Sequence, residues 1–185
     1  MAATESTVTS ANGRTRPLTP LKIRNLKHEP EHERNKLLNF IVDQAKRGTK
    51  SIGFIPRLGL EQAVETARVI VLENNDDQVG FAVTGGNRTR QKIFQVWVRE
   101  DARLILHGRA LVDHIDLHAS KRGRMAISLW CLETLPSNLF WAALGFKECE
   151  RRMRSLRHSH EQIRWVKPTI FAQRSLFAAN GESLV

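Results

Sequence analysis

Hydrophobic and polar positions along the first half of the chain predict a strand and helices followed by a meander. Residues 21–26 alternate apolar and polar side chains, which is typical of a strand. Residues 30–48 place apolar side chains at helical spacing between Pro30 and Gly48, so Pro30 begins and Gly48 caps the expected helix. The elements expected next are an apolar loop at 52–60, a short helix at 61–68 and antiparallel strands at 69–73, 79–85 and 92–98.

The second half predicts helices between the remaining strands. An apolar stripe starting at Ala102 and closed by KRGR indicates a helix. Residues 125–132 are almost continuously apolar, which favours a strand buried on both faces. Ser137 or Asn138 is the expected N-cap of a helix that ends at Gly145. A last strand pair is expected at 146–157 and 162–171, around a polar turn at 158–161.

This order of elements predicts an α+β fold with mixed strand pairing in a single domain at 21–171. Residues 1–20 are rich in Ser, Thr and Ala, and such a segment buries too little surface to offset the entropy of ordering. We expect a disordered N-terminal tail at 1–20 and a weakly ordered C-terminal tail at 172–185.

Composition narrows the class of protein. The chain has 185 residues, with 29 Lys and Arg against 19 Asp and Glu, a net charge of +10 that suits polyanionic or anionic ligands or a solvated surface. Two cysteines, Cys131 and Cys149, are too few for a disulfide framework and lack the spacing of a zinc site. Without a signal peptide or membrane span in the sequence, we expect a cytoplasmic monomer or homodimer with no membrane partner and no metal.

The stretch RLILHGRAL at 103–111 raises the first chemical hypothesis. It joins the strand ending in QVWV to a helix start, where free backbone N–H groups and the helix dipole form an anion site. Gly108 and Ala110 are small enough for a phosphate to approach the backbone, whereas Leu106 is bulky. By itself the stretch leaves open a phosphate site and an ordinary connection.

Together with QVWV before it and NLFWAALGF after it, this stretch resembles the GNAT superfamily of acyl-CoA-dependent N-acyltransferases. In that superfamily a Gln/Arg-x-x-Gly-x-Gly/Ala loop holds the CoA pyrophosphate, and the last helix ends in Leu-Gly-Phe. The leading Arg falls on Arg103, the first glycine on Leu106, the last small residue on Gly108, and Leu-Gly-Phe on residues 144–146. The resemblance implies a mostly antiparallel central sheet flanked by helices and splayed between its fourth and fifth strands.

The resemblance also implies an acyl-CoA cofactor, most simply acetyl-CoA, and an amine acceptor. The fourth strand would offer backbone groups to the pantetheine, the loop would receive the pyrophosphate, and the last helix would line the thiol end. The cofactor-binding residues implied are Val96, Trp97, Val98, Arg103, Leu104, Ile105, Leu106, His107, Gly108, Arg109, Ala110, Asn138 and Trp141.

Two departures concern Leu106 and the catalytic acid. Leu106 either removes a loop amide from the phosphates or turns its side chain into the core. Many members protonate the departing thiolate with a Tyr at the position of Trp141, but this chain has no Tyr, and an indole N–H does not ionise in the useful range. We therefore expect direct attack of a neutral amine, with water or a nearby acid handling the proton. The candidate acids are Glu133, which is preferred, and Glu100. With His107 and Cys131, they lie near the ends of the fourth and fifth strands.

The acceptor is less defined by the sequence. Phe54, Pro56 and Arg57 lie in the loop that commonly shapes the acceptor pocket, and Arg57 would favour an acceptor carrying phosphate or carboxylate. The basic run at 150–160, with Trp165 beyond it, suits either nucleic-acid contacts or a solvated face. A faint resemblance to phage Mom-type DNA-modification enzymes keeps two alternatives open: modification of a nucleobase, and a non-catalytic nucleic-acid-binding protein.

Overall fold

The computed structural model describes residues 7–9, 15–17, 21–47, 55–75, 77–103, 106–155 and 158–179. Within them, seven strands form one sheet in the order β3-β4-β5-β6-β7-β9-β8. Their bounds are β3 Lys22–Asn25, β4 Val69–Asn74, β5 Asp77–Gly86, β6 Arg90–Val98, β7 Ala126–Leu132, β8 Lys147–Ser155 and β9 His158–Pro168. All neighbouring pairs are antiparallel except β6 and β7, which are parallel. The predicted α+β class is confirmed.

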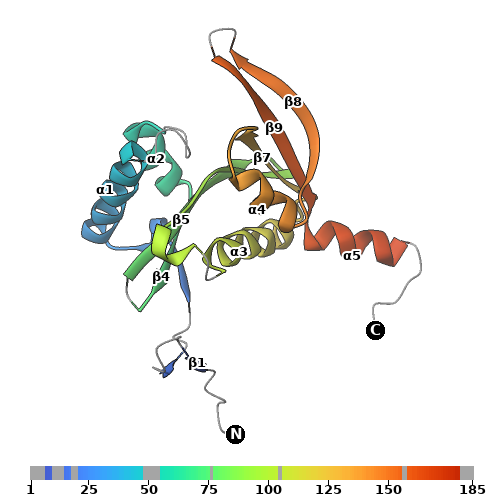
Figure 1. Cartoon of the computed structure of the whole chain (residues 1–185). Helices are drawn as coiled ribbons and strands as arrows, with labels where there is room; N and C mark the ends of the chain where they lie inside the picture. Colours follow the sequence, from blue (N-terminus) through green and yellow to red (C-terminus); the bar gives the residue numbers. More distant parts are fainter. Residues whose placement is uncertain are drawn as a thin grey trace, which may run out of the picture.

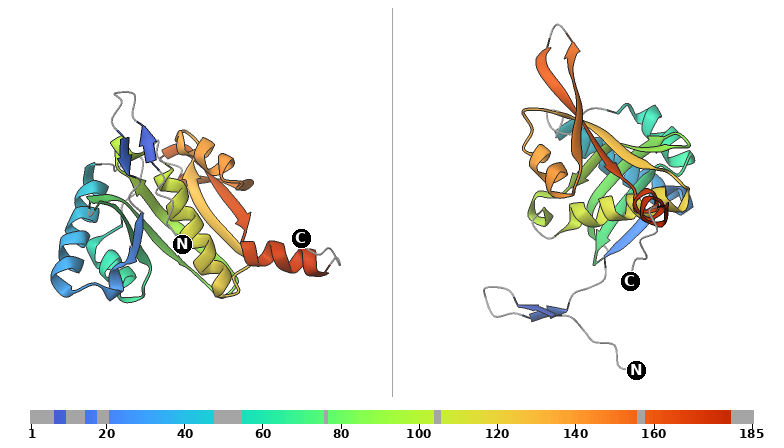
Figure 2. Two further views of the ribbon diagram at one scale, coloured as in Figure 1. Left: turned by 90° about the horizontal axis from the view of Figure 1, so that it is seen from below. Right: turned by 90° about the vertical axis from the view of Figure 1, so that its right-hand side faces the viewer.

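Helices cover both faces of this sheet, as Figures 1 and 2 show. The helices are α1 Glu31–Arg47, α2 Arg57–Glu65, α3 His107–Lys121, α4 Ser137–Ala143 and α5 Ile170–Ala179. The sequence of β4 is continuously apolar because both faces of the strand are packed. Val69 and Val71 pack with α1 and α2, whereas Ile70 and Leu72 pack with the cluster that includes α3 and α4. Burial on both faces removes the polar alternation of a one-sided strand.

The sheet opens at its centre, between β6 and β7. The two strands pair only from Arg90 to Lys92 and from Ala126 to Ser128, although β6 continues to Val98 and β7 to Leu132. An irregularity of the β5–β6 register leaves Phe94 without an opposite residue at the point where the strands part. A bulge of this kind bends its strand and increases its twist. The predicted splay between the fourth and fifth strands of the domain is confirmed.

Several element boundaries differ from the sequence predictions, among them the starts of α2, α3 and β9. Helix α2 begins at Arg57 instead of residue 61, because Leu60 belongs to the buried helical face with Ala63 and Val64. The polar residues 158–161 lie within β9 instead of a turn, so β9 begins earlier than expected, and Figure 1 shows the β8–β9 hairpin extending beyond the body.

Both predicted tails contain secondary structure. Two short strands, β1 Thr7–Thr9 and β2 Thr15–Pro17, pair antiparallel within the N-terminal tail. Helix α5 extends into the C-terminal tail because tertiary contacts stabilise its start: the Thr169 hydroxyl accepts from the Ala172 N–H at 3.2 Å, and the buried Asp116 accepts from the Ile170 N–H at 3.1 Å. Lys167 lies 3.4 Å from the same carboxylate. The division into one domain and two tails stays a prediction.

Candidate functional site

The opening beside β6 is the centre of the candidate site. From Ile93 to Val98, β6 pairs with β5 on one side and has left β7 on the other. Apart from the Val98 oxygen, which accepts from Arg103, the N–H and C=O groups on that side are therefore available to a ligand that pairs like a strand. Among the residues predicted here, Val96 and Val98 pack toward α3, while Trp97 stacks on Phe81 on the opposite face, with ring centroids 5.6 Å apart. Their side chains are packing groups, and only their backbone faces the opening.

Leu106 precedes α3 in the left-handed region, with φ of 55°, and its side chain is 72% exposed. The idea that this side chain turns into the core is therefore wrong. Left-handed backbone is the conformation that glycine adopts without strain, which is the residue that the resemblance places here. The neighbouring Leu104 and Ile105 lie outside the described residues.

Gly108 is small for a reason other than the one predicted. It is buried in the first turn of α3, and a Cβ added there would lie 3.1 Å from Cζ of Phe140 in α4. The missing side chain therefore allows α3 to pack closely on α4. The space it leaves is filled by protein and does not face a phosphate.

His107 and Ala110 complete the first turn of α3. The His107 ring is 2% exposed, and its Nδ1 lies 3.0 Å from the carbonyl oxygen of Ala102 in the 3₁₀ helix Glu100–Ala102. Its side chain therefore ties the connection to the helix and cannot reach a ligand. The Ala110 N–H donates to the Leu106 oxygen at 3.0 Å, so the free helical amides lie before Ala110.

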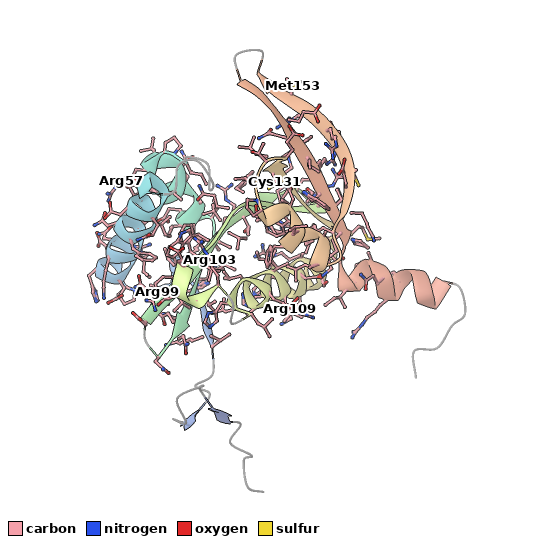
Figure 3. All side chains as sticks on the ribbon, in the orientation of Figure 1. Arg57, Arg99, Arg103, Arg109, Cys131 and Met153 are labelled. Carbon is pink, nitrogen blue, oxygen red and sulfur yellow. The ribbon has the colours of Figure 1, made fainter. Side chains whose placement is uncertain are left out.

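Two predicted arginines flank this helix start (Figure 3). Arg103 is exposed, and its Nε donates to the Val98 oxygen at 3.1 Å, at the end of β6. Within the described part of the chain no carboxylate pairs with Arg103, so its charge remains available. Arg109 lies 3.3 Å from Asp113 in an exposed pair, which is weak enough to rearrange when an anion binds.

Asn138 does not act as predicted. Its Nδ2 donates to the carbonyl oxygens of Leu132, Glu133 and Leu135 at 2.8, 3.0 and 2.9 Å, and its Oδ1 accepts from the Trp165 indole at 2.9 Å. All its hydrogen-bonding groups are thus occupied by protein. The residue is also not an N-cap, because α4 begins after Pro136 without a side-chain cap. Asn138 holds the connection from β7 to α4.

Trp141 and Cys131 lie beneath this connection. Trp141 is buried, and its ring meets Phe140 and Phe146 edge-on at 4.9 and 5.5 Å. The Cys131 sulfur lies 3.3 Å from the Ser137 hydroxyl, and burial raises the pKa of the Cys131 thiol. Both side chains are therefore core groups, and neither supplies an ionised catalyst near neutral pH.

The two carboxylates considered as catalysts stand at the ends of the diverging strands. Glu133 is exposed just after β7, and its carboxylate lies 3.6 Å from Arg151. Glu100 is exposed just after β6. Since β6 and β7 diverge toward these ends, the structure does not bring the two carboxylates together as a pair.

The predicted acceptor loop is only partly described. Phe54 lies outside the described residues, and the exposed Pro56 precedes α2. Arg57 is the first residue of α2, and its guanidinium binds Glu61 and Asn39, both at 2.9 Å. The positive charge of Arg57 is therefore partly compensated by Glu61 of the same helix.

Carboxylates compensate more of the positive charge on the β8–β9 hairpin than its sequence suggests. Arg151 binds Glu148 at 2.5 Å and Glu161 at 3.4 Å, and Arg164 binds Glu150 at 2.8 Å. Glu148 is on the same strand as Arg151, whereas the Arg151–Glu161 and Arg164–Glu150 pairs join facing strands and therefore depend on strand register. Trp165, the aromatic residue singled out beside this run, is buried against the core.

Sequence reasoning missed a different arginine–aromatic pair. The guanidinium of Arg152 lies 3.9 Å from the ring centroid of Trp130, on the face of the sheet opposite Cys131. Register between β7, β9 and β8 brings the two residues together. The sequence contained no signal for this pair, because 21 residues separate its members.

The described residues contain neither a metal-binding cluster nor a membrane-spanning helix. No group of three or more potential ligands among them is arranged to bind a metal ion. No helix in the same part of the chain is long and apolar enough to cross a membrane.

A family model and solved structures of known proteins are similar to this chain. A family model described as "Acetyltransferase (GNAT) domain" matches residues 65–148, which contain β4 to β7, α3 and α4. Ard1 from Thermoplasma volcanium superposes with a TM-score of 0.69 at 16% identity, covering 81% of this chain and 98% of that one. The chain has the GNAT fold. The resemblance seen in the sequence is confirmed.

Other GNAT structures agree. The ribosomal-protein-S18-alanine N-acetyltransferase from Escherichia coli has a TM-score of 0.62 at 18% identity, with 81% of this chain and 94% of that chain covered. N-acetylglutamate synthase from Neisseria gonorrhoeae, complexed with coenzyme A and N-acetyl-glutamate, has a TM-score of 0.65 at 15% identity, covering 82% and 35%. No curated protein sequence matches the chain. At such identities, these structural likenesses show the GNAT fold.

Proposed function

We propose that this protein is an N-acyltransferase that moves an acyl group, acetyl in the simplest case, from acyl-CoA to a primary amine. The observation that carries the proposal is the opening of the sheet between β6 and β7, directly beside the free start of α3. It combines strand-edge backbone groups with an anion-binding helix end, which are the two features that an amide-containing, pyrophosphate-linked donor needs.

The residues present fit such a donor substrate. The edge of β6 from Ile93 to Val98 would bind the pantetheine amides, and the first amides of α3 would bind the pyrophosphate together with Arg103 and Arg109. The exposed side chain of Leu106 does not cover the start of the helix. The backbone of Leu106 has the left-handed conformation that a glycine would adopt there. The match to the GNAT acetyltransferase model supports this assignment.

The proposed chemistry is direct transfer. The donor supplies an acyl thioester, whose carbonyl oxygen would be polarised by backbone N–H groups of β6. The lone pair of a neutral amine attacks the carbonyl carbon, a C–N bond forms, the C–S bond breaks, and the thiolate takes up a proton from water. The proton that the amine loses passes to Glu133, and Glu100 is the second candidate acceptor of that proton. When the Glu133 carboxylate is removed, the proton passes to water.

Isothermal titration with acetyl-CoA tests the proposal. We expect saturable binding of one equivalent, weakened about tenfold by Arg103→Glu because the substitution replaces a charge-assisted contact with repulsion. Arg88→Glu is the matched control, since Arg88 is exposed in the turn at the other end of β6 and undergoes the same change of charge. No binding to the wild type at millimolar acetyl-CoA would overturn the proposal.

Turnover measurements test the proton transfer. With an accepted amine, Glu133→Gln should lower kcat about 100-fold, whereas Trp141→Phe should leave kcat per folded enzyme largely intact. An unchanged kcat in Glu133→Gln and in Glu100→Gln would assign the proton to water. A large fall with Trp141→Phe would contradict its assignment to packing.

The nucleic-acid alternatives rest on the net charge of +10 and the basic hairpin. Compensation of Arg151 and Arg164 by carboxylates removes part of that support. Duplex binding that weakens steeply with salt, combined with absence of acetyl-CoA binding, would favour a binding protein over an enzyme. Binding of both would point to modification of a nucleobase.

A further inference from the structure

Three side chains form a cluster on the open face of β7, β9 and β8: Trp130, Arg152 and Gln162. Arg152 is directly opposite Gln162, and its Nε and Nη2 both donate to the Gln162 Oε1, at 3.3 and 3.2 Å. Its guanidinium then reaches across β9 to lie 3.9 Å from the centroid of the Trp130 ring. Stacking and hydrogen bonding together hold the guanidinium over the indole ring.

This cluster lies on the side of the sheet where an acceptor could approach the opening. Alternation along β7 directs Leu129 and Cys131 into the core with Trp141, so Trp130 points to the opposite face. Helices α1 and α2 cover that face over β4 and β5, while Figures 1 and 2 show the β8–β9 hairpin standing clear of them. Trp130 is half-buried two residues beyond Ser128, where β7 parts from β6.

Arg152 differs electrostatically from its neighbours on the hairpin. Arg151 and Arg164 both pair with carboxylates. Arg152 is exposed, and the side chains that it contacts in the described part of the chain are a neutral amide and an indole. Its positive charge is therefore positioned but not compensated. A guanidinium in this state is suited to bind a planar or tetrahedral oxyanion through its remaining N–H groups.

We propose that Trp130, Arg152 and Gln162 form an acceptor subsite that recognises an oxyanion, either carboxylate or phosphate, carried by the amine substrate. The inference rests on the proposed acyltransferase function and names the class of its acceptor. It moves oxyanion recognition from Arg57, whose guanidinium is bound to Glu61 and Asn39, to Arg152. The indole supplies an apolar floor for the carbon chain between the oxyanion and the amine.

Two matched pairs of primary amines test the subsite by NMR. O-phosphoethanolamine is compared with ethanolamine, and 4-aminobutyrate with 4-aminobutanamide, so that each pair differs in its oxyanion. The indole N–H signal of Trp130, assigned from its loss in Trp130→Phe, is followed in the full chain. We expect at least one anionic amine to bind about tenfold more tightly than its neutral partner. The pair that discriminates identifies phosphate or carboxylate as the group recognised.

Arg152→Gln should abolish this discrimination while leaving acetyl-CoA affinity unchanged. Arg88→Gln, which removes one exposed charge from the distant turn between β5 and β6, should preserve it. Equal binding within both pairs, or unchanged discrimination in Arg152→Gln, would overturn the subsite. A short DNA duplex that shifts the Trp130 signal at lower concentration than either anionic amine would also overturn it, in favour of a nucleic-acid contact.

The separate titration with acetyl-CoA distinguishes the two proposals. Discrimination between the amines without acetyl-CoA binding would refute the acyltransferase and retain the oxyanion site. Acetyl-CoA binding without discrimination would retain the acyltransferase and refute the oxyanion site.

Discussion

Replacing Asn138 tests whether this side chain supports the β7–α4 connection or lines a ligand site. Its amide has two protons for three carbonyl oxygens at 2.8 to 3.0 Å, so one proton makes a single bond and the other is shared between two oxygens. Its oxygen accepts from the indole of Trp165, which is 8% exposed. Asn138→Ala therefore removes about three hydrogen bonds, each worth about 1 kcal/mol net.

The expected loss in free energy of unfolding is thus about 3 kcal/mol, which for a chain of this length corresponds to a fall in Tm of roughly 6–12 °C. Asn138→Asp should be more destabilising than Asn138→Ala near neutral pH, because its carboxylate would face the carbonyl oxygens of Leu132, Glu133 and Leu135 without a proton to donate. The order of the two stabilities tests the assignment, because a change in side-chain volume alone predicts that Asn138→Ala is the more destabilising substitution.

Urea unfolding followed by circular dichroism measures the free energies. Asn39→Ala is the matched control: this exposed asparagine accepts one bond, from Arg57, and its loss should cost less than about 0.5 kcal/mol. If Asn138→Asp were as stable as Asn138→Ala, or if Asn138→Ala weakened acetyl-CoA binding without loss of stability, the assignment to a structural role would be refuted.

Three further predictions concern α3. Leu106→Gly should be about 1 kcal/mol more stable to urea than Leu106→Ala, because glycine relieves the left-handed strain; equal stabilities would contradict this. Gly108→Glu should lower the free energy of unfolding by about 3 kcal/mol or more, because its side chain enters the space of Phe140; a variant of wild-type stability that fails only to bind acetyl-CoA would instead show that this position faces the pyrophosphate. Burial lowers the pKa values of His114 and His118 below 6.5, so the unfolded state binds more protons in mild acid and stability is lost as the pH falls through the folded pKa values. His114→Gln should flatten the decline in urea stability between about pH 7 and pH 5; a slope equal to that of the wild type would contradict the shift.

The elements of the fold could be predicted from local pattern. The periodicity of residues 30–48 predicted α1, and the apolar run at 125–132 predicted the strand β7, although Trp130 on its second face is only half-buried and lies on the open side of the sheet. These predictions succeed because hydrophobic spacing must match the geometry of a helix or strand within a few residues. The spacing of RLILHGRAL from the Leu-Gly-Phe ending was enough to show the resemblance to the superfamily whose fold the chain has.

The roles of single side chains could not be predicted in the same way. Gly108 was taken for a phosphate-facing residue, and Asn138 for a cofactor-lining one, but each is occupied by a contact with another element. The tail after residue 171, expected to be weakly ordered, continues a helix whose first amide is bound by Asp116, far earlier in the chain. Such contacts depend on which elements the fold brings together, and no local pattern contains that information.

The sequence by itself thus determined where the strands and helices lie, the superfamily resemblance and the positive charge. Tertiary structure alone decided how that charge is distributed. Strand register brings Glu161 to Arg151 and Glu150 to Arg164, and places Arg152 on Trp130 with a neutral amide beside it. The physical reason is that an ion pair requires approach within about 4 Å, and residues distant in sequence reach that separation only when the sheet aligns their strands.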